Sequence, residues 1–407
     1  MAETTEFHDE PVLDTAVYQQ NGVGLDELND LVDRCQDTLS ALRSLGMTPN
    51  SEKRLMKHYR ARKVADMVGF SRTKITKAID DLGLVQDTDS ETERPLGYTL
   101  AQVNQIRDAL DARPGRRADE APIRLAVQSF KGGVAKSVTT VYIAQYLAEK
   151  GYRVLVVDCD PQASATQSFG YVPDHEFTER HTLSPALHGE EETLDYAIIP
   201  TYFDGIDLVP SCLALNEVDF AIYDAVARAE TEERDAFYHL VEDAIVTVEN
   251  RYDVVLMDSA PNLSMMSINI LVAANAVVVP APPAIYDFSS TSQYLQMVSK
   301  VMTGIAPGKR YEFLKVMPSK VDRSKSKMLD FLAIMQDKFG NFLLAKPFLY
   351  ASAIPDTASY FQTVYDQAKP DHRVMTMLNG VLGEIEVEIC KTWPSRHDAL
   401  RERGVLL

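Results

Sequence analysis

One short loop limits the folds open to this chain more than any other feature. Residues 131–137 read Lys-Gly-Gly-Val-Ala-Lys-Ser and lie between two regular patterns. The apolar run at 123–128 predicts a strand, and residues 137–150, closed by Gly151, predict a helix. A loop that leaves a strand and opens a helix points its free backbone N–H groups at one place, where the helix dipole adds positive potential. The sequence therefore predicts an anion site at the start of an α/β unit.

The residues of this loop make phosphate the expected anion. Gly132 and Gly133 let the backbone approach phosphate oxygens without a clash from a Cβ atom. Lys136 would place its ammonium on the terminal phosphates, and Ser137 would offer its hydroxyl to Mg²⁺. Ala135 stands where the usual pattern G-x-x-x-x-G-K-[ST] has glycine. It is still small, so we expect little effect on phosphate binding.

Acidic residues end two further apolar strands, predicted at 153–158 and 252–258. Asp258 closes the second strand, where a carboxylate would hold a metal-bound water. Asp158 and Asp160 follow the first strand, at a spacing where a dinucleotide-binding dehydrogenase would bind a ribose. The chain has no G-x-G-x-x-G here, and an acid facing the phosphates is well placed to orient a water for attack. A turn or cap role remains the alternative for Asp160 and Asp258.

The pattern after Pro122 also predicts the fold class. Further apolar strands are predicted at 276–280 and 311–317, with helices between the strands. Apolar strands that alternate with helices predict a doubly wound, mostly parallel sheet covered on both faces. At 407 residues, the chain is long enough for two or three domains.

Composition excludes several other classes of protein. The four cysteines form no C-x-x-C pair, which disfavours a disulfide framework or a zinc ribbon and favours a reducing cytosol. The first residues, MAETTEFHDEP, are acidic and polar and do not resemble a secretory signal. The longest apolar stretch, around 271–285, is interrupted by Asn275 and three prolines, so no membrane span is expected. The net charge of −18 argues against a nucleic-acid coat.

The segment 51–84 nevertheless has a local excess of basic residues, with nine Lys/Arg against four Asp/Glu. Ala65, Gly69 and Ile75 have helix-turn-helix spacing, in which alanine lets two helices approach, glycine makes the turn and isoleucine enters the core. Ser71 would cap the second helix. The side chains available to a major groove are then Arg72, Thr73, Lys74, Thr76 and Lys77. A basic helical hairpin without a role on DNA is the alternative.

A heptad pattern precedes this domain. Two series of apolar residues each repeat every seven residues, and the second series begins three residues after the first. The first is Leu25, Val32 and Leu39, and the second is Leu28, Cys35 and Leu42. Gly46 supplies a stop signal. The helix either packs on its own domain or dimerises, and we expect a dimerisation helix at 21–46. We expect residues 1–20 to form a flexible tail. Residues 113–121 are rich in Pro, Gly and charged residues, which indicates a linker.

Three motifs together resemble one protein family. KGGVAKS, VLVVDCDPQAS and VVLMDSAP resemble the deviant Walker-A ATPases of the ParA/MinD group, and most of all the ParA-type plasmid partition ATPases. VVVPAPP at 277–283 and SAIPDTAS at 352–359 resemble later stretches of that family less specifically. The resemblance covers about 122–407, which it implies is the ATPase domain. RPLGYTLAQVNQI at 94–106 resembles the wing and following helix of winged helix-turn-helix domains. We therefore expect a winged helix-turn-helix DNA-binding domain at 47–112. With such a domain, the chain resembles the long form of the family.

The resemblance implies a nucleotide site that takes ATP or ADP with Mg²⁺ in a sandwich homodimer. Lys131 would be the signature lysine that reaches the partner's phosphates, and Asp160 would position the hydrolytic water. The metal site would involve Ser137, Asp158 and Asp258. An adenine pocket is expected in the loop after the strand at 311–317, near Met317–Lys320, with Met317 and Pro318 in the binding set. The implied nucleotide-binding set is Lys131, Gly132, Gly133, Val134, Ala135, Lys136, Ser137, Val138, Met317 and Pro318.

The implied function is movement or positioning of plasmid DNA by ATP hydrolysis, with a centromere-binding ParB-type protein as partner. The long form also represses its own operon through operator DNA, and a cytoplasmic, nucleoid-associated protein is expected. The basic run at 315–327 is either a face for nonspecific nucleoid DNA or a solvated loop. A nucleotide-sensing repressor without a motor role is the alternative. A MinD-like membrane cycle would need a basic amphipathic C-terminal helix, which Glu384, Glu386 and Glu388 disfavour.

Overall fold

A computed structural model describes residues 23–46, 57–89, 92–230, 232–358 and 362–406. The predicted tail at 1–20 and residues 47–56 of the predicted DNA-binding domain lie outside the described residues. The chain divides into two compact units, residues 1–48 and residues 49–407, and each is described by itself.

The first unit contains the helix that the heptads predicted, α2 (Leu25–Gly46). Its apolar side chains Leu25, Leu28 and Val32 are exposed, as is the Cys35 thiol. A row of exposed apolar side chains at heptad spacing suits pairing with another helix. Dimerisation through α2 stays a prediction.

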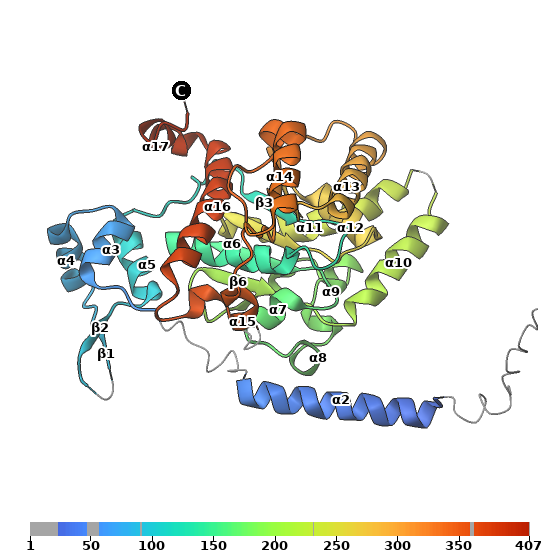
Figure 1. Ribbon diagram of the computed structural model, residues 1–407, viewed down its shortest axis with the longest axis horizontal. Coiled ribbons are helices and arrows are strands. Elements are labelled where there is room, and N and C mark those ends of the chain that lie inside the picture. Colours follow the sequence, from blue (N-terminus) through green and yellow to red (C-terminus); the bar gives the residue numbers. More distant parts are fainter. Residues whose placement is uncertain (1–22, 47–56, 90–91, 231, 359–361, 407) are drawn as a thin grey trace, which may run out of the picture. The chain divides into compact units, whose positions relative to one another are not determined.

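The second unit is built on a seven-stranded sheet with the strand order β5-β6-β4-β7-β3-β8-β9 (Figure 1). All neighbouring strands are parallel except the antiparallel edge pair of β5 and β6. The predicted doubly wound, mostly parallel fold is confirmed. The strands are β3 (Ile123–Val127), β4 (Val154–Asp158), β5 (Ile199–Pro200), β6 (Ile206–Val209), β7 (Val254–Asp258), β8 (Ala276–Ala281) and β9 (Phe313–Pro318).

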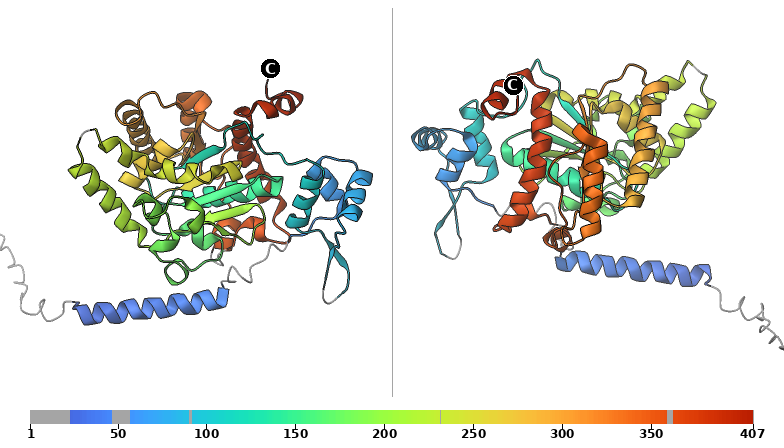
Figure 2. Two further views of the ribbon diagram at one scale, coloured as in Figure 1. Left: turned by 180° about the vertical axis from the view of Figure 1, so that it is seen from behind. Right: turned by 45° about the horizontal axis from the view of Figure 1, so that its top comes forward.

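Helices cover both faces of this sheet, which Figure 2 shows from two further directions. On one face, Leu125 and Val156 join a buried cluster with α6 (Lys136–Lys150) and α16 (His372–Lys391). On the other, alternate strand residues pack with α11 (Leu240–Val246), α12 (Met265–Ala273) and α13 (Ile285–Gly304). Each central strand is therefore buried on both faces, which explains its continuous apolar sequence.

The remaining helices of this unit line its edges and loops. They include α7 (Ser164–Ser168), α8 (Pro173–Glu176), α9 (Ser184–Leu187), α10 (Leu215–Arg228), α14 (Ser326–Phe339), α15 (Ala353–Ala358) and α17 (His397–Glu402). No sequence pattern indicated β5 and β6, because strands of two and four residues are too short to show a period in their apolar residues.

Residues 57–112 contain the predicted helix-turn-helix and a short hairpin. The helices are α3 (Ala61–Val68), α4 (Arg72–Asp81) and α5 (Leu100–Ala109), and the hairpin pairs β1 (Asp87–Thr88) with β2 (Pro95–Gly97). Gly69 ends α3 with φ of +81°, in the left-handed region that glycine adopts easily. The Ser71 hydroxyl accepts a hydrogen bond from the Lys74 N–H at 3.4 Å, and Ile75 is buried. The local elements expected from the spacing are confirmed.

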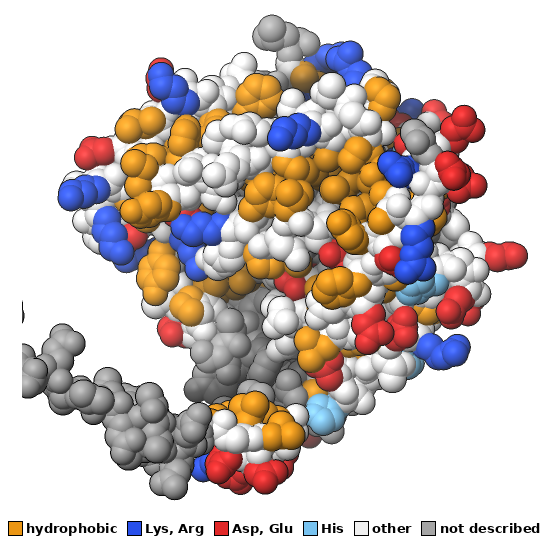
Figure 3. All heavy atoms as spheres, turned by 90° about the vertical axis from the view of Figure 1, so that its right-hand side faces the viewer, with side chains coloured by type: hydrophobic (Ala, Val, Ile, Leu, Met, Phe, Trp, Pro, Cys, Tyr) orange, Lys and Arg blue, Asp and Glu red, His pale blue; other side chains and the backbone are white. Residues whose placement is uncertain are grey.

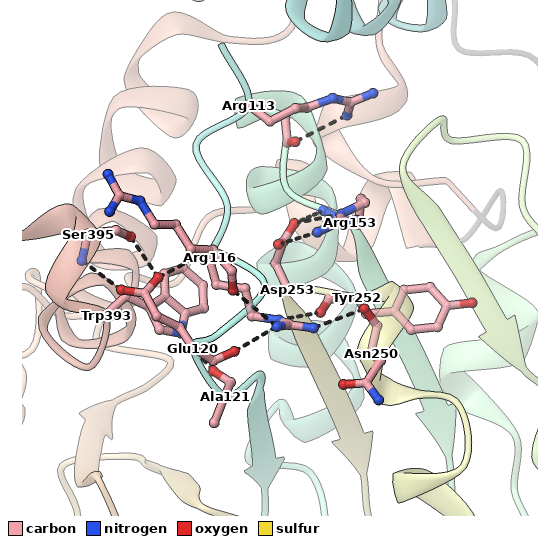
Figure 4. Close-up of polar contacts among 12 residues, drawn as sticks. Arg113, Arg116, Glu120, Ala121, Arg153, Asn250, Tyr252, Asp253, Trp393 and Ser395 are labelled. Carbon is pink, nitrogen blue, oxygen red and sulfur yellow. Dashed lines mark hydrogen bonds and ion pairs between the residues drawn. The ribbon is translucent and has the colours of Figure 1, made fainter. Parts of the chain in front are cut away.

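The predicted linker is tied to the sheet by one arginine (Figure 4). The Arg116 guanidinium donates to the carbonyl oxygens of Tyr252 and Asn250, at 3.0 and 2.9 Å. A third hydrogen bond, of 2.6 Å, reaches the Glu120 carbonyl within the linker itself. A fourth reaches the Arg117 carbonyl at 3.2 Å. Four carbonyls on one guanidinium give this segment a defined path across the strand ends.

The C-terminal segment holds the other end of the linker (Figure 4). The Glu120 carboxylate accepts from the Ser395 N–H and from the Ser395 hydroxyl, both at 2.6 Å. The Trp393 indole donates to the Ala121 carbonyl at 2.9 Å, and the indole is buried. Slight burial alone would raise the pKa of the Glu120 carboxyl, but the hydrogen bonds from Ser395 and from the Arg117 N–H hold it below its usual range. The linker is thus clamped between the sheet and the last part of the chain.

Candidate functional site

The predicted phosphate loop lies between β3 and α6, where the free N–H groups of α6 begin. Gly133 has φ of +73° and Ala135 has φ of +77°, so both take the left-handed conformation. For an alanine this conformation costs about 1–2 kcal/mol. The structure therefore explains why the usual pattern has glycine at this position. The expectation that Ala135 has little effect on phosphate binding stays a prediction.

Lys136 is buried at the first turn of α6, with 6% of its surface exposed. Its ammonium donates to the Lys131 carbonyl at 3.2 Å, across the mouth of the loop. Burial lowers the pKa of Lys136, and the carboxylates of Asp258 and Asp160 partly restore it. The chain thus holds a buried lysine, whose positive charge is favoured by two carboxylates, at the point where phosphate is expected.

Asp258 ends β7 beneath the same helix and is fully buried. Its Oδ1 accepts from the Thr140 hydroxyl at 3.0 Å, while Oδ2 has no hydrogen-bond partner among the described residues. Burial raises the pKa of Asp258, and the hydroxyls of Ser137 and Thr140 lower it in part. An unpartnered buried carboxylate oxygen beside a serine hydroxyl fits the oxygen donors that Mg²⁺ takes. The residues present therefore suit the expected metal.

Asp158 lies directly opposite Asp258 in the register of β4 and β7. Its carboxylate accepts from the N–H and hydroxyl of Thr166, at 2.8 and 2.7 Å, and from the Asp160 N–H at 3.2 Å. Burial and the negative charge of Asp258 raise the pKa of Asp158. These three hydrogen bonds show Asp158 holding the loop that carries Asp160, whereas its predicted role as a metal ligand stays a prediction.

The predicted water-positioning residue follows two positions later. Asp160 is 7% exposed, and its Oδ1 accepts from the Gln162 N–H at 3.0 Å. The negative charge of Asp160 favours the protonated ammonium of Lys136 and so partly offsets the lowering of its pKa by burial. Two predicted residues of the nucleotide set, Val134 and Val138, belong to the loop and the first turn of α6.

The predicted signature lysine makes an ion pair within its own chain. The Lys131 ammonium lies 2.8 Å from Asp287 Oδ1, in the first turn of α13. The lysine side chain is 39% exposed, whereas Asp287 is largely buried. In this state, Lys131 points to its own protomer, so a role on a partner's phosphates requires that this ion pair open.

The loop expected to form the adenine pocket, near Met317–Lys320, contributes Lys320 to a cavity beside the phosphate loop, whereas Met317 and Pro318 are not among the residues that line it. Met317 and Pro318 are buried at the end of β9. This cavity, of about 240 Å³, opens between the phosphate loop and the segment 348–355, and its lining is mostly apolar. The lining residues are Ala135, Val138, Lys320, Phe348, Leu349, Tyr350, Ala351, Ile354 and Pro355. Residues 348–351 carry no motif that assigns them to a site. The following stretch, 352–359, resembles the family only weakly.

All five residues predicted to reach a DNA groove are exposed on α4: Arg72, Thr73, Lys74, Thr76 and Lys77. The Lys74 ammonium lies 3.4 Å from the centroid of the Phe70 ring, a cation–π contact that fixes the direction of this side chain.

Across the described residues, no group of three or more His, Cys, Asp or Glu residues is arranged to hold a metal ion. Within those same residues, no helix is both long and apolar enough to cross a bilayer.

Comparison with known proteins places these features in a family. Residues 123–308 match the family model described as an AAA domain. Protein SopA of Escherichia coli K12 is 31% identical over 323 residues, which are 78% of this chain and 82% of SopA. A putative replication protein A of Sinorhizobium fredii is 29% identical and covers 86% of this chain and 91% of its own length. Plasmid partition protein A of Escherichia coli is 28% identical over 52% of this chain and 56% of its own length.

Two solved structures share the fold. A partition protein superposes with a TM-score of 0.60 and 19% identity, covering 89% of this chain and 98% of its own. The complex of a Cyanothece McdA variant with ATP superposes with a TM-score of 0.54 and 18% identity, covering 66% of this chain and 97% of its own.

Proposed function

The chain belongs to the ParA-type partition ATPases, and on that premise we propose that it binds and hydrolyses ATP with Mg²⁺ as a sandwich dimer. The hydrolysis cycle positions plasmid DNA together with a centromere-binding ParB-type partner. The observation that carries the proposal is the phosphate loop between β3 and α6, with buried Lys136 on the first turn of α6, Asp258 at the end of β7 and Asp160 just after β4. A buried cation and carboxylates that follow neighbouring strands at a phosphate loop suit phosphoryl transfer.

Each residue of the site has a part in this chemistry. The loop N–H groups and the Lys136 ammonium hold the β- and γ-phosphates of ATP, and Ser137 and Asp258 would hold Mg²⁺. Mg²⁺, when bound, neutralises charge on the transferred phosphoryl group. Asp160 orients the attacking water, and the hydrogen bonds of Asp158 keep the Asp160 loop in place.

The cavity beside the loop supports a finer assignment for the base. Its apolar lining suits a flat aromatic ring, and Val138 and Tyr350 lie on it. Tyr350 is largely exposed, so it is free to lie against a nucleotide base. We therefore assign the adenine to this cavity rather than to the side chains of Met317 and Pro318.

The sandwich dimer is supported by the surface near Lys131. Figure 3 shows apolar side chains gathered on one face of the molecule. Exposed apolar residues of this unit include Ile285 and Tyr286, which directly precede Asp287 at the start of α13. A second copy that covers them would bring its own phosphates within reach of Lys131 once the ion pair to Asp287 opens. Contacts of α2 with another α2 would add a second dimer interface, independent of nucleotide.

The proposed function includes two DNA surfaces. Operator DNA would be bound by α4, which gives the protein control of its own operon. Nonspecific nucleoid DNA would be bound at a second, basic surface. There, Arg323 of the run at 315–327 lines a cavity of about 710 Å³ with Lys346, His372 and Arg373. Clustered cations on one face suit phosphate contacts, which need no base readout.

The partition role is tested by ATPase rates and by plasmid inheritance. We expect nonspecific DNA and the ParB-type partner together to raise the ATPase rate severalfold above the basal rate. We also expect deletion of the gene to increase plasmid loss when expression of the partner is held constant from another promoter. A nucleotide-sensing repressor would change expression of the operon but leave inheritance normal under constant expression, and that result would contradict the proposal.

The operator-binding helix is tested by salt dependence. Replacing Lys74 and Lys77 with alanine removes two exposed cations of α4. We expect the log–log slope of operator affinity against salt to become shallower by about 0.9 for each lost phosphate contact. Fluorescence anisotropy with labelled operator DNA at several salt concentrations measures this slope. A control with Lys338→Ala, on α14, should leave the slope unchanged. An unchanged slope in the double variant would show that these lysines do not touch DNA.

A further inference from the structure

Helix α10 carries an exposed apolar face at the outer edge of the second unit (Figure 1). Its residues Leu215, Val218 and Ile222 are buried and join the cluster that also contains α12. On the opposite face, Phe220 is 76% exposed and Tyr223 is 67% exposed. The two rings lie about one helical turn apart and so form a single stripe along the helix. Two aromatic rings left in water on one stripe make this face a candidate docking surface.

The surroundings of these rings are strongly acidic. Residues 215–235 contain seven Asp/Glu against two Arg. Both arginines are engaged within this segment, because Arg228 pairs with Asp224 at 2.7 Å and Arg234 donates to the Ala229 carbonyl at 3.1 Å. The exposed glutamates of the segment that form no ion pair with another described residue are Glu217, Glu230, Glu232 and Glu233. The apolar stripe is therefore bordered by uncompensated negative charge.

This charge decides which kind of partner fits the face. DNA and anionic lipid carry negative charge and would be repelled by it. A second copy of α10 would bring the same row of acids opposite the first, and like charges across an interface are unfavourable. A protein helix with apolar residues on one side and Lys/Arg along its flanks would instead cover the rings and pair with the glutamates.

α10 is also tied to the part of the chain that follows Asp258. Its Asp219 Oδ1 accepts from the Met266 N–H at 2.8 Å, in the first turn of α12. The loop 259–264 joins Asp258, at the end of β7, to this helix. Leu263, in that loop, is 60% exposed. A protein docked on α10 would therefore lie on the element that holds the start of α12, directly after the expected metal ligand.

We propose that the face of α10 with Phe220, Tyr223 and Glu217 is the docking surface for a basic amphipathic helix of the partner protein. The proposal rests on the proposed function, because it takes the ParB-type partner as the protein that carries this helix. The aromatic rings supply the buried contact, while the glutamates steer the basic helix and fix its orientation. The surface uses none of the residues assigned to the sandwich dimer.

The rings are tested by partner binding to the full-length chain with a non-hydrolysable ATP analogue. In Phe220→Asp, we expect the affinity for the purified ParB-type protein to fall about 10-fold or more, because aromatic residues dominate interface energies. The partner concentration for half-maximal ATPase stimulation should rise by the same factor, while the basal ATPase rate stays within about twofold of wild type. The matched control, Phe342→Asp, changes a phenylalanine that is 60% exposed just after α14, and it should keep wild-type affinity.

The charge is tested by association kinetics. In Glu217→Lys, one turn before Phe220, we expect association with the partner to slow severalfold at low salt and to approach the wild-type rate at high salt, since salt screens exposed charges. Stopped-flow fluorescence measures this rate. Glu402→Lys makes the same charge change at an exposed position of α17, and it should keep the wild-type rate at both salt concentrations.

Several outcomes would overturn this docking surface. One is wild-type partner affinity in Phe220→Asp and in Tyr223→Asp, the variant that serves alone if the first does not fold. Another is loss of the ATP-dependent dimer in folded Phe220→Asp, measured by light scattering, because the face would then belong to a second copy. Equal slowing by Glu402→Lys would show that net charge alone sets the rate. A wild-type chain that the partner does not bind would instead contradict the proposed function, and this inference with it.

Discussion

Replacing Lys136 with alanine is expected to weaken ATP binding by about 10- to 100-fold and to abolish nucleotide-dependent DNA binding. Hydrogen bonds to charged groups contribute about 1.5–3 kcal/mol each, which corresponds to this range of affinity. The loss has a second cause, because the positive charge of Lys136 no longer offsets the negative charges of Asp258 and Asp160. Two acids without a cation would repel an incoming triphosphate. Titration with a fluorescent ATP analogue measures the affinity, and a DNA-binding assay with and without ATP measures the consequence.

The control for this experiment lies at the other end of the same helix. Lys150→Ala makes the same chemical change at an exposed position, and we expect it to leave ATP affinity within about twofold of wild type. Thermal unfolding shows whether each variant is folded. Near wild-type ATP affinity in a folded Lys136→Ala protein would remove the basis for the phosphate site.

Replacing Asp160 with alanine is expected to keep ATP binding but to slow hydrolysis by about 10²- to 10⁴-fold, the usual range for loss of a group that handles the proton of the attacking water. ATP affinity should persist because the loop N–H groups, Lys136 and Asp258 all remain. The variant should therefore accumulate in its ATP-bound form, bound to nonspecific DNA even with the partner present. Single-turnover hydrolysis separates the chemical step from nucleotide binding.

Asp160→Asn distinguishes a chemical role from a structural one. Its amide oxygen still accepts from the Gln162 N–H, so the fold of the loop is kept while the negative charge is lost. We expect it to hydrolyse ATP as slowly as Asp160→Ala. Hydrolysis at the wild-type rate in either variant would show that Asp160 does not orient the water.

The parts of the site that the sequence predicted are those set by local geometry. The strand, loop and helix around Lys136 follow from an apolar run, two glycines and a glycine stop, because each acts within a few residues. Asp158 and Asp258, which the family resemblance assigns to one metal site, end neighbouring parallel strands and lie in register. The hydrogen bonds that occupy Asp158 depend on Thr166, whose placement follows from the packing of α7 and not from a motif.

The contacts that sequence could not predict join segments far apart in the chain. Lys131 forms an ion pair with Asp287, and Glu149 forms one with Lys57. Nothing in the sequence around these residues indicates either pairing. The cavity between the phosphate loop and residues 348–355 has the same origin, since a cavity is defined by how distant segments pack. The short strands β5 and β6 are stabilised by the edge of an existing sheet, so their own sequence carries little signal.

The clamp on residues 113–121 has a consequence for biosynthesis. A ribosome makes Glu120 and Ala121 long before Trp393 and Ser395, which complete their hydrogen bonds. Domains generally fold as units, N-terminal first, during translation. The hydrogen bonds from Trp393 and Ser395 therefore form only after nearly the whole polypeptide has emerged, and nascent chains stalled before Trp393 should lack this half of the clamp.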